Sequence, residues 1–152
     1  MKKSMCAIML IVIVASFAGC KNISQDNKEQ DILNVEIEEM VMKIDTISVD
    51  ITWENNNSVK DLFNFAKNGL TINMSRYGGF EQVGSIGKNI VSNNKQITTS
   101  PGDVVLYNSN QIVIFFGTNT WSYTKLGHIN LNQTELNNLL NKSNVVLYLN
   151  NK

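Results

Sequence analysis

The stretch PGDVVLYNSNQIVIFF, residues 101–116, contains two apolar runs separated by a short polar segment. Residues 104–107 and 112–116 are rich in Val, Ile, Leu, Tyr and Phe, which favour β-strands. Asn and Ser at 108–110 are typical of a tight turn, so the pattern predicts a β-hairpin. The second run is apolar on both faces, which indicates a strand that is covered on two sides.

Strand patterns continue on both sides of this hairpin. The clearest runs over residues 47–54, where every second residue is apolar and one buried face is expected to hold Ile47, Val49, Ile51 and Trp53. Further strands are predicted at residues 40–44, 70–75, 121–126 and 145–149.

Two short helices complete the expected set of elements. Ser58 begins the first through a capping-box variant with Asp61, and Gly69 ends it. Asn132 caps the second, with Glu135 at the third helical position. About eight strands and two helices indicate a mostly-β domain, either a closed barrel or a sandwich.

The first residues of the chain have the pattern of an export signal. Lys2 and Lys3 precede an uncharged, mostly apolar run over residues 5–17 that is too short to span a membrane. Ala18 and Gly19, followed at once by Cys20, resemble the lipobox of bacterial lipoprotein signals, although Phe17 stands where Leu is usual. An ordinary cleaved signal and an uncleaved anchor are the alternatives.

These features predict three parts: a signal peptide at 1–19, a polar tether at 20–38 and one folded domain at 39–150. Lipidated Cys20 would attach the protein to a membrane on its extracytoplasmic side. The mature chain would have no second cysteine, which excludes an intramolecular disulfide and zinc–thiolate chemistry. Its slightly negative charge and single arginine argue against nucleic-acid binding. His128, the only histidine, is expected to be a surface residue or a satisfied structural one, and neither a metal nor a cofactor is expected.

Residues 74–87, MSRYGGFEQVGSIG, form the best candidate for a functional site. They include the only arginine, Arg76, next to Tyr77 and Phe80, and four glycines that allow unusual backbone conformations. We interpret this segment as a compact loop that forms the wall of a cleft. The alternative for Arg76 is structural, with its guanidinium stacked on Tyr77 or paired with Glu81.

An ordered series of motifs carries a resemblance to a known family. The motifs are YGGFE with VG at residues 77–84, QIT at 96–98, PGDVVLY at 101–107, IVIFFG at 112–117 and WSYTKLG at 121–127. Over about residues 40–149 the chain resembles a bacterial family of small cyclophilin-like domains. The resemblance implies a closed β-barrel of about eight strands with two short helices, no firmly assigned activity, and export as a lipoprotein in some members.

The resulting hypothesis is a membrane-anchored module that binds a peptide or small ligand beside the loop at 76–84. The candidate ligand-binding residues are Arg76, Tyr77, Phe80, Glu81, Phe116, Trp121 and Tyr123. At least two of the aromatic residues at 115, 116, 121 and 123 are expected to be core packing. One alternative is a peptidyl-prolyl isomerase with Arg76 as the candidate catalytic residue. True cyclophilins use an arginine, but the residues around Arg76 differ from theirs, so the analogy is one of position and not of matching motifs. A surface scaffold for protein contacts is the other alternative.

Overall fold

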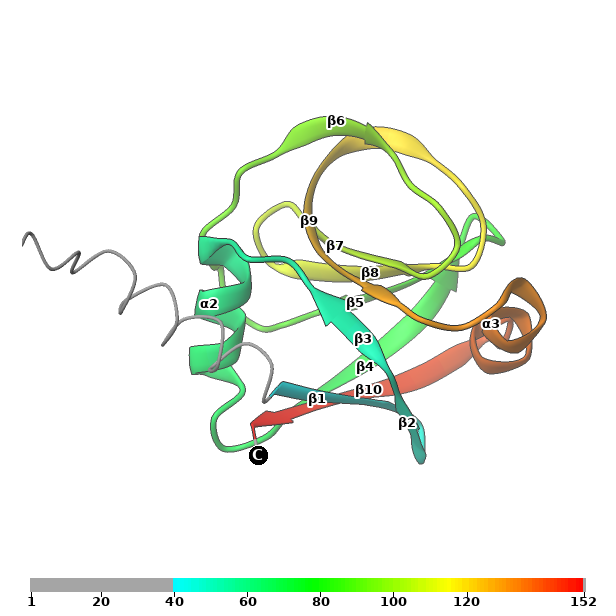
Figure 1. The fold of residues 1–152 in the computed structure, drawn as a ribbon, viewed down its shortest axis with the longest axis horizontal. Coiled ribbons are helices and arrows are strands. Elements are labelled where there is room, and N and C mark those ends of the chain that lie inside the picture. Colours follow the sequence, from blue (N-terminus) through cyan, green and yellow to red (C-terminus); the bar gives the residue numbers. More distant parts are fainter. Residues whose placement is uncertain (1–39, 152) are drawn as a thin grey trace, which may run out of the picture.

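The computed structural model describes residues 40–151, which form ten strands and two helices (Figure 1). The strands are β1 (Met40–Ile44), β2 (Ile47–Val49), β3 (Ile51–Trp53), β4 (Leu70–Tyr77), β5 (Glu81–Ser85), β6 (Lys95–Thr98), β7 (Asp103–Tyr107), β8 (Gln111–Phe115), β9 (Thr120–Ile129) and β10 (Asn144–Asn151). The helices are α2 (Asn57–Phe65) and α3 (Gln133–Leu140).

The sheet curves into a nearly closed barrel. Its strand order is β2-β1-β10-β4-β5-β8-β7-β9-β3, and β6 pairs with β9 outside this path. The two ends of the path, β2 and β3, are consecutive in the chain with only Asp50 between them. The Trp53 indole donates a hydrogen bond to the Met40 carbonyl at 3.0 Å, which links β3 to β1 across this seam. The predicted mostly-β barrel with two helices is therefore confirmed.

The main hydrophobic core fills the barrel and includes both helices. Val59, Leu62 and Phe63 from α2 and Leu136 and Leu140 from α3 are buried with the inward side chains of the strands. In Figure 1 the two helices lie at opposite ends of the barrel. Their apolar stripes thus close the ends while their polar faces meet solvent.

A second, smaller cluster lies on the other face of β7 and β8. It contains Val105, Val113, Phe115 and Tyr123. Ile112 and Ile114, which alternate with Val113 and Phe115 along β8, belong to the main core instead. This strand is covered on both faces, as the sequence predicted. β6 and the first half of β9 arch away from the barrel on this side (Figure 1).

Three sequence-based predictions about strands were wrong. Residues 74–87 are not a compact loop: β4 continues to Tyr77, the turn covers only residues 78–80, and β5 begins at Glu81. Residues 47–54 are not one strand, because the chain bends at Asp50 so that its halves pair with β1 and β9. No strand was predicted within residues 88–100, but this segment contains β6, whose polar side chains gave no strand signal.

The helix caps were predicted with mixed success. Asn132 and Glu135 form the expected capping box at the start of α3. The first helix is capped by Asn56, whose side chain accepts from Val59 N–H, and not by Ser58. Asp61 accepts a hydrogen bond from the Val91 backbone instead of closing a capping box.

The predicted signal at 1–19, lipidation at Cys20 and tether at 20–38 lie outside the described residues. In the part of the chain that the structure describes, neither helix has the length and apolar character needed to cross a membrane.

Candidate ligand-binding site

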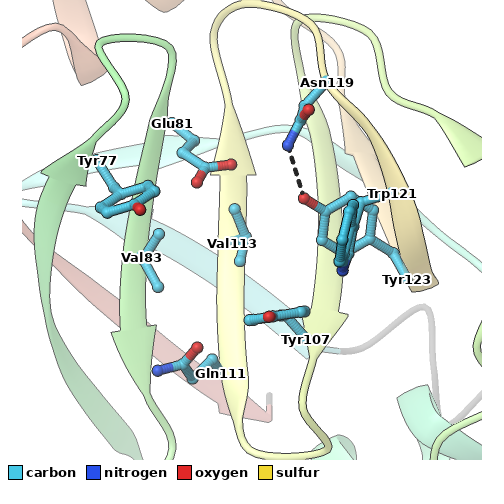
Figure 2. A pocket seen from close by; sticks show the side chains of 9 residues that line it. All are labelled: Tyr77, Glu81, Val83, Tyr107, Gln111, Val113, Asn119, Trp121 and Tyr123. Carbon is cyan, nitrogen blue, oxygen red and sulfur yellow. Dashed lines mark hydrogen bonds between the residues drawn. The ribbon is translucent and has the colours of Figure 1, made fainter.

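A cavity of about 460 Å³ lies on the outer face of the sheet, on the side of the second hydrophobic cluster. It is lined by Tyr77, Glu81, Val83, Tyr107, Gln111, Val113, Asn119, Trp121 and Tyr123. Figure 2 shows these side chains projecting toward one shared space, Asn119 from the loop before β9 and the others from β4, β5, β7, β8 and β9. Val83 and Val113, which are opposite each other on β5 and β8, form its apolar floor.

Glu81 is the one charged side chain among these nine residues. Only 6% of its surface is exposed, and its Oε2 is buried without a hydrogen-bond partner among the described residues. Burial raises the pKa of Glu81 to about 7 because a charge in this position loses its hydration. The carboxyl group therefore changes its protonation state near neutral pH and keeps unused hydrogen-bonding capacity.

Tyr123 forms a fixed wall of the cavity. Its ring packs edge-on against Phe115 and Tyr107, with centroid distances of 5.7 and 5.8 Å. Its hydroxyl oxygen accepts a hydrogen bond from the Asn119 side chain at 3.0 Å. Burial raises the pKa of this phenol, and the nearby Glu81 carboxylate raises it further, so the group stays neutral.

Two large aromatic side chains stand at the rim. Tyr77 is 69% exposed and Trp121 is 58% exposed, which is unusual for residues of this size. In Figure 2 they lie on opposite sides of Glu81 and Val113. Exposed rings beside a concave, largely apolar surface are typical of a ligand site, because they can close over a bound group.

The local sequence explains why these side chains converge. Gly78 and Gly79 have φ of 59° and 79°, which a tight turn requires and glycine adopts without strain. The turn sets Tyr77 directly opposite Glu81, so the two side chains share one face of the hairpin. Trp121 and Tyr123 are two residues apart on β9 and therefore also point the same way.

The structure brings four of the seven candidate residues together at this cavity: Tyr77, Glu81, Trp121 and Tyr123. Phe80 stacks on Phe115 beside it, with ring centroids 6.4 Å apart. Phe116 is buried in the main core. The expectation that at least two of the four aromatic residues at 115, 116, 121 and 123 are packing residues is confirmed, since only Trp121 is exposed.

Arg76 lies apart from these residues. It follows Ser75 and precedes Tyr77 on β4, so its side chain projects from the other face of the strand. Its Nη1 donates to the Asn141 side chain at 2.8 Å, just past the end of α3. Arg76 is exposed and does not line the cavity, and its hydrogen-bond partner is neither Tyr77 nor Glu81.

Five lining residues were not among the sequence candidates: Val83, Tyr107, Gln111, Val113 and Asn119. Two of them had a usable signal. Tyr107 and Val113 belong to the predicted hairpin. Because the strand at 112–116 is apolar on both faces, the sequence indicated that other residues cover its second face as well. Which residues of other strands share that face depends on register, which the sequence alone did not provide.

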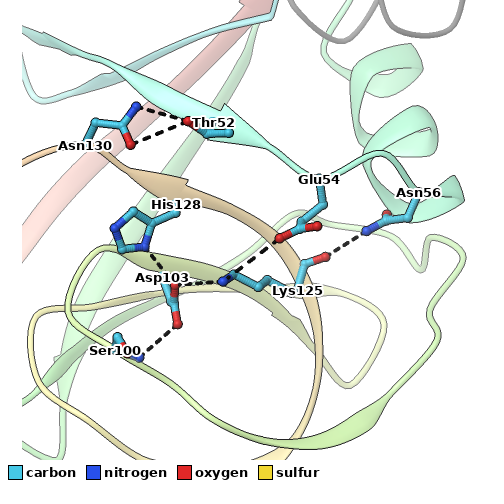
Figure 3. Close-up of polar contacts among 8 residues, drawn as sticks. All are labelled: Thr52, Glu54, Asn56, Ser100, Asp103, Lys125, His128 and Asn130. Carbon is cyan, nitrogen blue, oxygen red and sulfur yellow. Dashed lines mark hydrogen bonds and ion pairs between the residues drawn. The ribbon is translucent and has the colours of Figure 1, made fainter.

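A second polar cluster surrounds Asp103 (Figure 3). One carboxylate oxygen is 2.8 Å from His128 Nδ1 and 3.2 Å from Lys125 Nζ, and the other accepts from Ser100 N–H. Burial alone would raise the pKa of Asp103, but these hydrogen bonds and the lysine charge together hold it below its ordinary value. Because both oxygens are used, the cluster fixes the turn before β7 and its contact with β9.

The lining offers few kinds of chemical group. The nine lining residues include no serine, cysteine, histidine or lysine, so Glu81 and the tyrosines are the only titratable groups. Within residues 40–151, no group of three His, Cys, Asp or Glu side chains is placed to hold a metal ion. The cavity offers an apolar floor, aromatic walls and one carboxyl group.

The family model for the cyclophilin-like family matches residues 42–149, more than half of the chain. The chain belongs to the cyclophilin-like family. The matched span begins in β1 and ends in β10, so every cavity-lining residue lies within the cyclophilin-like domain. Comparisons with curated proteins and with solved structures gave no match. Membership establishes the domain type, while the function has to be argued from the site.

Proposed function

We propose that this cyclophilin-like domain is a binding module for a small ligand or a peptide side chain, held outside the cytoplasm by a lipid anchor at Cys20. The main support is Glu81, a buried carboxyl group with an unpartnered oxygen at a cavity of about 460 Å³. Proteins rarely leave such a group unsatisfied, because each one costs about 1–3 kcal/mol or more. A bound ligand would supply the missing partner.

Isomerisation of prolyl bonds has less support. The sequence hypothesis required Arg76 to face the site, whereas its guanidinium donates to Asn141 on the other face of β4. None of the residues that line the cavity is an arginine. A flat protein-interaction surface is also less well supported, because the exposed rings of Tyr77 and Trp121 border a concave space.

Fluorescence of Trp121 provides the test of ligand binding. The chain has two tryptophans, so Trp53→Phe leaves Trp121 as the only indole and removes a reporter that lies at the barrel seam. We expect some members of a panel of small cationic, neutral and anionic aromatic compounds to change Trp121 emission in a saturable manner. Absence of saturable binding for every charge class would contradict the proposed function.

Attachment through Cys20 is tested separately. Expression of the full chain in a bacterial host with a radiolabelled fatty acid should label the protein and place it in the membrane fraction. Cys20→Ala should lose the label, because no sulfur remains at the acylation position. Cys6→Ala is the matched control and should keep it. Equal labelling of the Cys20 variant would contradict the anchor.

A further inference from the structure

The charge balance of the cavity is one-sided. Glu81 supplies a negative charge when it is ionised, and the other eight lining residues include no lysine, arginine or histidine to neutralise it. Its Oε2 has no donor among the described residues, although the side chain is more than nine-tenths buried. A carboxylate in this setting has its strongest partner in a group that brings both a positive charge and an N–H donor.

The walls of the cavity favour the same kind of group. Tyr77, Tyr107, Trp121 and Tyr123 contribute four aromatic rings to the lining. The faces of tyrosine and tryptophan rings carry negative electrostatic potential and attract cations, most strongly where water is excluded. Aromatic rings around one carboxyl group therefore complement an ammonium group better than a neutral or anionic one.

We infer that the cavity binds an organic ammonium ion, which donates a hydrogen bond to Glu81 and packs its apolar body between Tyr77, Trp121 and the valine floor. This inference depends on the proposed binding function and adds the class of ligand. An apolar body is required because Val83 and Val113 offer no polar atoms at the base of the cavity. A free amine and a lysine side chain of a peptide share this chemistry.

The protonation of Glu81 gives the inference a distinctive pH signature. The polar side chains that share the cavity with it are Tyr77 from β4, Tyr107 from β7, Gln111 from β8, Asn119 before β9, and Trp121 and Tyr123 from β9, and none of them is a carboxylate, lysine, arginine or histidine. Because burial raises the pKa of Glu81 to about 7, the partner charge is lost below that pH. Alkylammonium groups stay protonated throughout this range. Amine binding should therefore weaken as the pH falls from 8 to 6.

The experiment compares three probes of similar shape by calorimetry on the full-length chain in detergent. The probes are phenethylammonium, the neutral 2-phenylethanol and the anionic phenylacetate. At pH 8 we expect the amine to bind about tenfold or more tightly than the alcohol, the ratio that one charge-assisted hydrogen bond provides. A capped tripeptide with a central lysine, set against one with norleucine, tests the peptide source in the same way.

Two variants connect the effect to the carboxyl group. Glu81→Gln keeps the size of the side chain, so we expect it to lower amine affinity about tenfold, to change alcohol affinity less than about twofold and to abolish the pH dependence. Glu54→Gln, which removes the same charge from an exposed position, is the matched control and should leave the affinity unchanged. Amine binding that equals alcohol binding, or that is unchanged in Glu81→Gln, would overturn the inference.

Failure of the inference can be told apart from failure of the proposed function. If the neutral or anionic probe binds at Trp121 while neither the free amine nor the lysine peptide does, the cavity is a binding site and the ammonium assignment is wrong. If no compound of any charge class binds, both proposals fall together.

Discussion

At the scale of single residues, the most informative feature is the placement of Glu81. Its neighbours across the hairpin and the sheet are Tyr77 and Phe115, so the sequence surrounds a carboxyl group with aromatic carbon. Burial without a partner destabilises the ionised form, and the fold gains nothing in return from any described group. Strongly shifted carboxyl groups of this kind concentrate at functional sites, which is why Glu81 is central to the proposed function.

The raised pKa of Glu81 predicts a pH dependence of folding stability. Since the pKa is near 4.5 in the unfolded chain and about 7 in the folded one, the favourable contribution is complete below pH 4.5 and is lost as the pH rises to 7. The loss is at most about 3 kcal/mol, from 1.36 kcal/mol per unit of pKa. We expect Glu81→Gln to unfold at higher urea concentration than the wild type at pH 8.

The same comparison at pH 5 serves as the control, because there the wild-type carboxyl group is already neutral and the two proteins should differ much less. Glu54→Gln should show no such difference between the two pH values, since its carboxylate is exposed. If Glu81→Gln stabilised the protein equally at pH 5 and pH 8, ionisation of the buried Glu81 carboxyl group would not be the cause.

Gly84 provides a second prediction at this scale, and its cause is steric. A Cβ atom there would lie 2.5 Å from Ile72 Cγ2 and 2.9 Å from the Asn73 carbonyl oxygen. We expect Gly84→Ala to lower the free energy of unfolding by about 1–3 kcal/mol, as overpacking usually does. Gly87→Ala meets nothing within 4 Å and strains only a φ of 83°, so it isolates the backbone cost, about 1–2 kcal/mol. Urea denaturation at pH 5 measures the free energy of unfolding of both variants. A Gly84→Ala protein as stable as the wild type would contradict the close packing around Gly84.

Sequence patterns located some site residues and missed others for a physical reason. Tyr77 and Glu81 were accessible because aromatic and acidic residues beside glycines are conspicuous. Val83 was not, because on its own strand it reads as an ordinary strand residue, and the predicted hairpin placed Tyr107 on a strand without showing which residues share its face. Their role follows only from the pairing of β5 with β8 and of β8 with β7, which is a long-range property.

At the scale of elements, the β4–β5 hairpin joins the cavity to the rest of the barrel. Glu81 faces the cavity, whereas its neighbour Gln82 points the other way and is fully buried. The Gln82 amide donates to the carbonyl oxygens of Leu140 and Lys142 at 2.7 and 2.8 Å. These carbonyls lie at and just beyond the end of α3; the Leu140 carbonyl also accepts from Lys142 N–H, whereas that of Lys142 lies past the helix and receives only the Gln82 amide among the described contacts.

Gln82→Leu should therefore loosen the end of α3. The Lys142 carbonyl loses its donor while the Leu140 carbonyl keeps the Lys142 N–H, so we expect a loss of about 1–3 kcal/mol of unfolding free energy, the cost of one unsatisfied group. Amide hydrogen exchange should accelerate more at residues 138–142 than in β7. The exposed substitution Gln96→Leu on β6 is the matched control. If amide exchange accelerated equally across the whole domain, the idea that Gln82 stabilises the end of α3 locally would be contradicted.

The elements that the sequence predicted well have strong local signals. The β7–β8 hairpin combines two apolar runs with a polar turn, and the capping box of α3 is a contiguous motif. β6 could not be predicted in this way, because Lys95, Gln96 and Thr98 form an edge strand that pairs only with β9. The bend at Asp50 could not be predicted either. Apolar and polar residues alternate without interruption over residues 47–54, although β2 pairs with β1 and β3 pairs with β9.

At the scale of the whole molecule, the barrel has two hydrophobic clusters with different roles. The larger one holds the barrel and its helices together, and the smaller one supports the cavity through Val113 and Tyr123. Strand β7 links the two, since Val104 enters the main core while Val105 enters the smaller cluster. The barrel core and the proposed binding cavity thus lie on opposite faces of the same strands.

The acidic groups of the domain together predict an optimum of stability near pH 5. Hydrogen bonds from the Val146 backbone and Lys142 lower the pKa of Asp45, and the contacts described above lower that of Asp103. Their contributions are present above about pH 4 and are lost as the pH falls below it, while that of Glu81 is lost toward pH 7. Thermal unfolding from pH 3 to 9 should show this maximum.

Single variants separate the two sides of this profile. Asp103→Asn should make stability depend less on pH below about pH 4 and leave the decline toward pH 7 in place. Glu81→Gln should remove the decline toward pH 7 and leave the loss of stability below about pH 4 in place. A wild-type stability that rises steadily from pH 5 to pH 8 would be inconsistent with a buried, unpaired Glu81.

The central claim is that the cavity binds organic ammonium ions, and a crystal structure of the chain with phenethylammonium tests it most directly. We expect the ring of the amine between Tyr77 and Trp121 and its nitrogen within about 3 Å of a Glu81 oxygen, a normal charge-assisted hydrogen bond. An ammonium group bound elsewhere, with the cavity between β5 and β9 unchanged, would contradict the central claim.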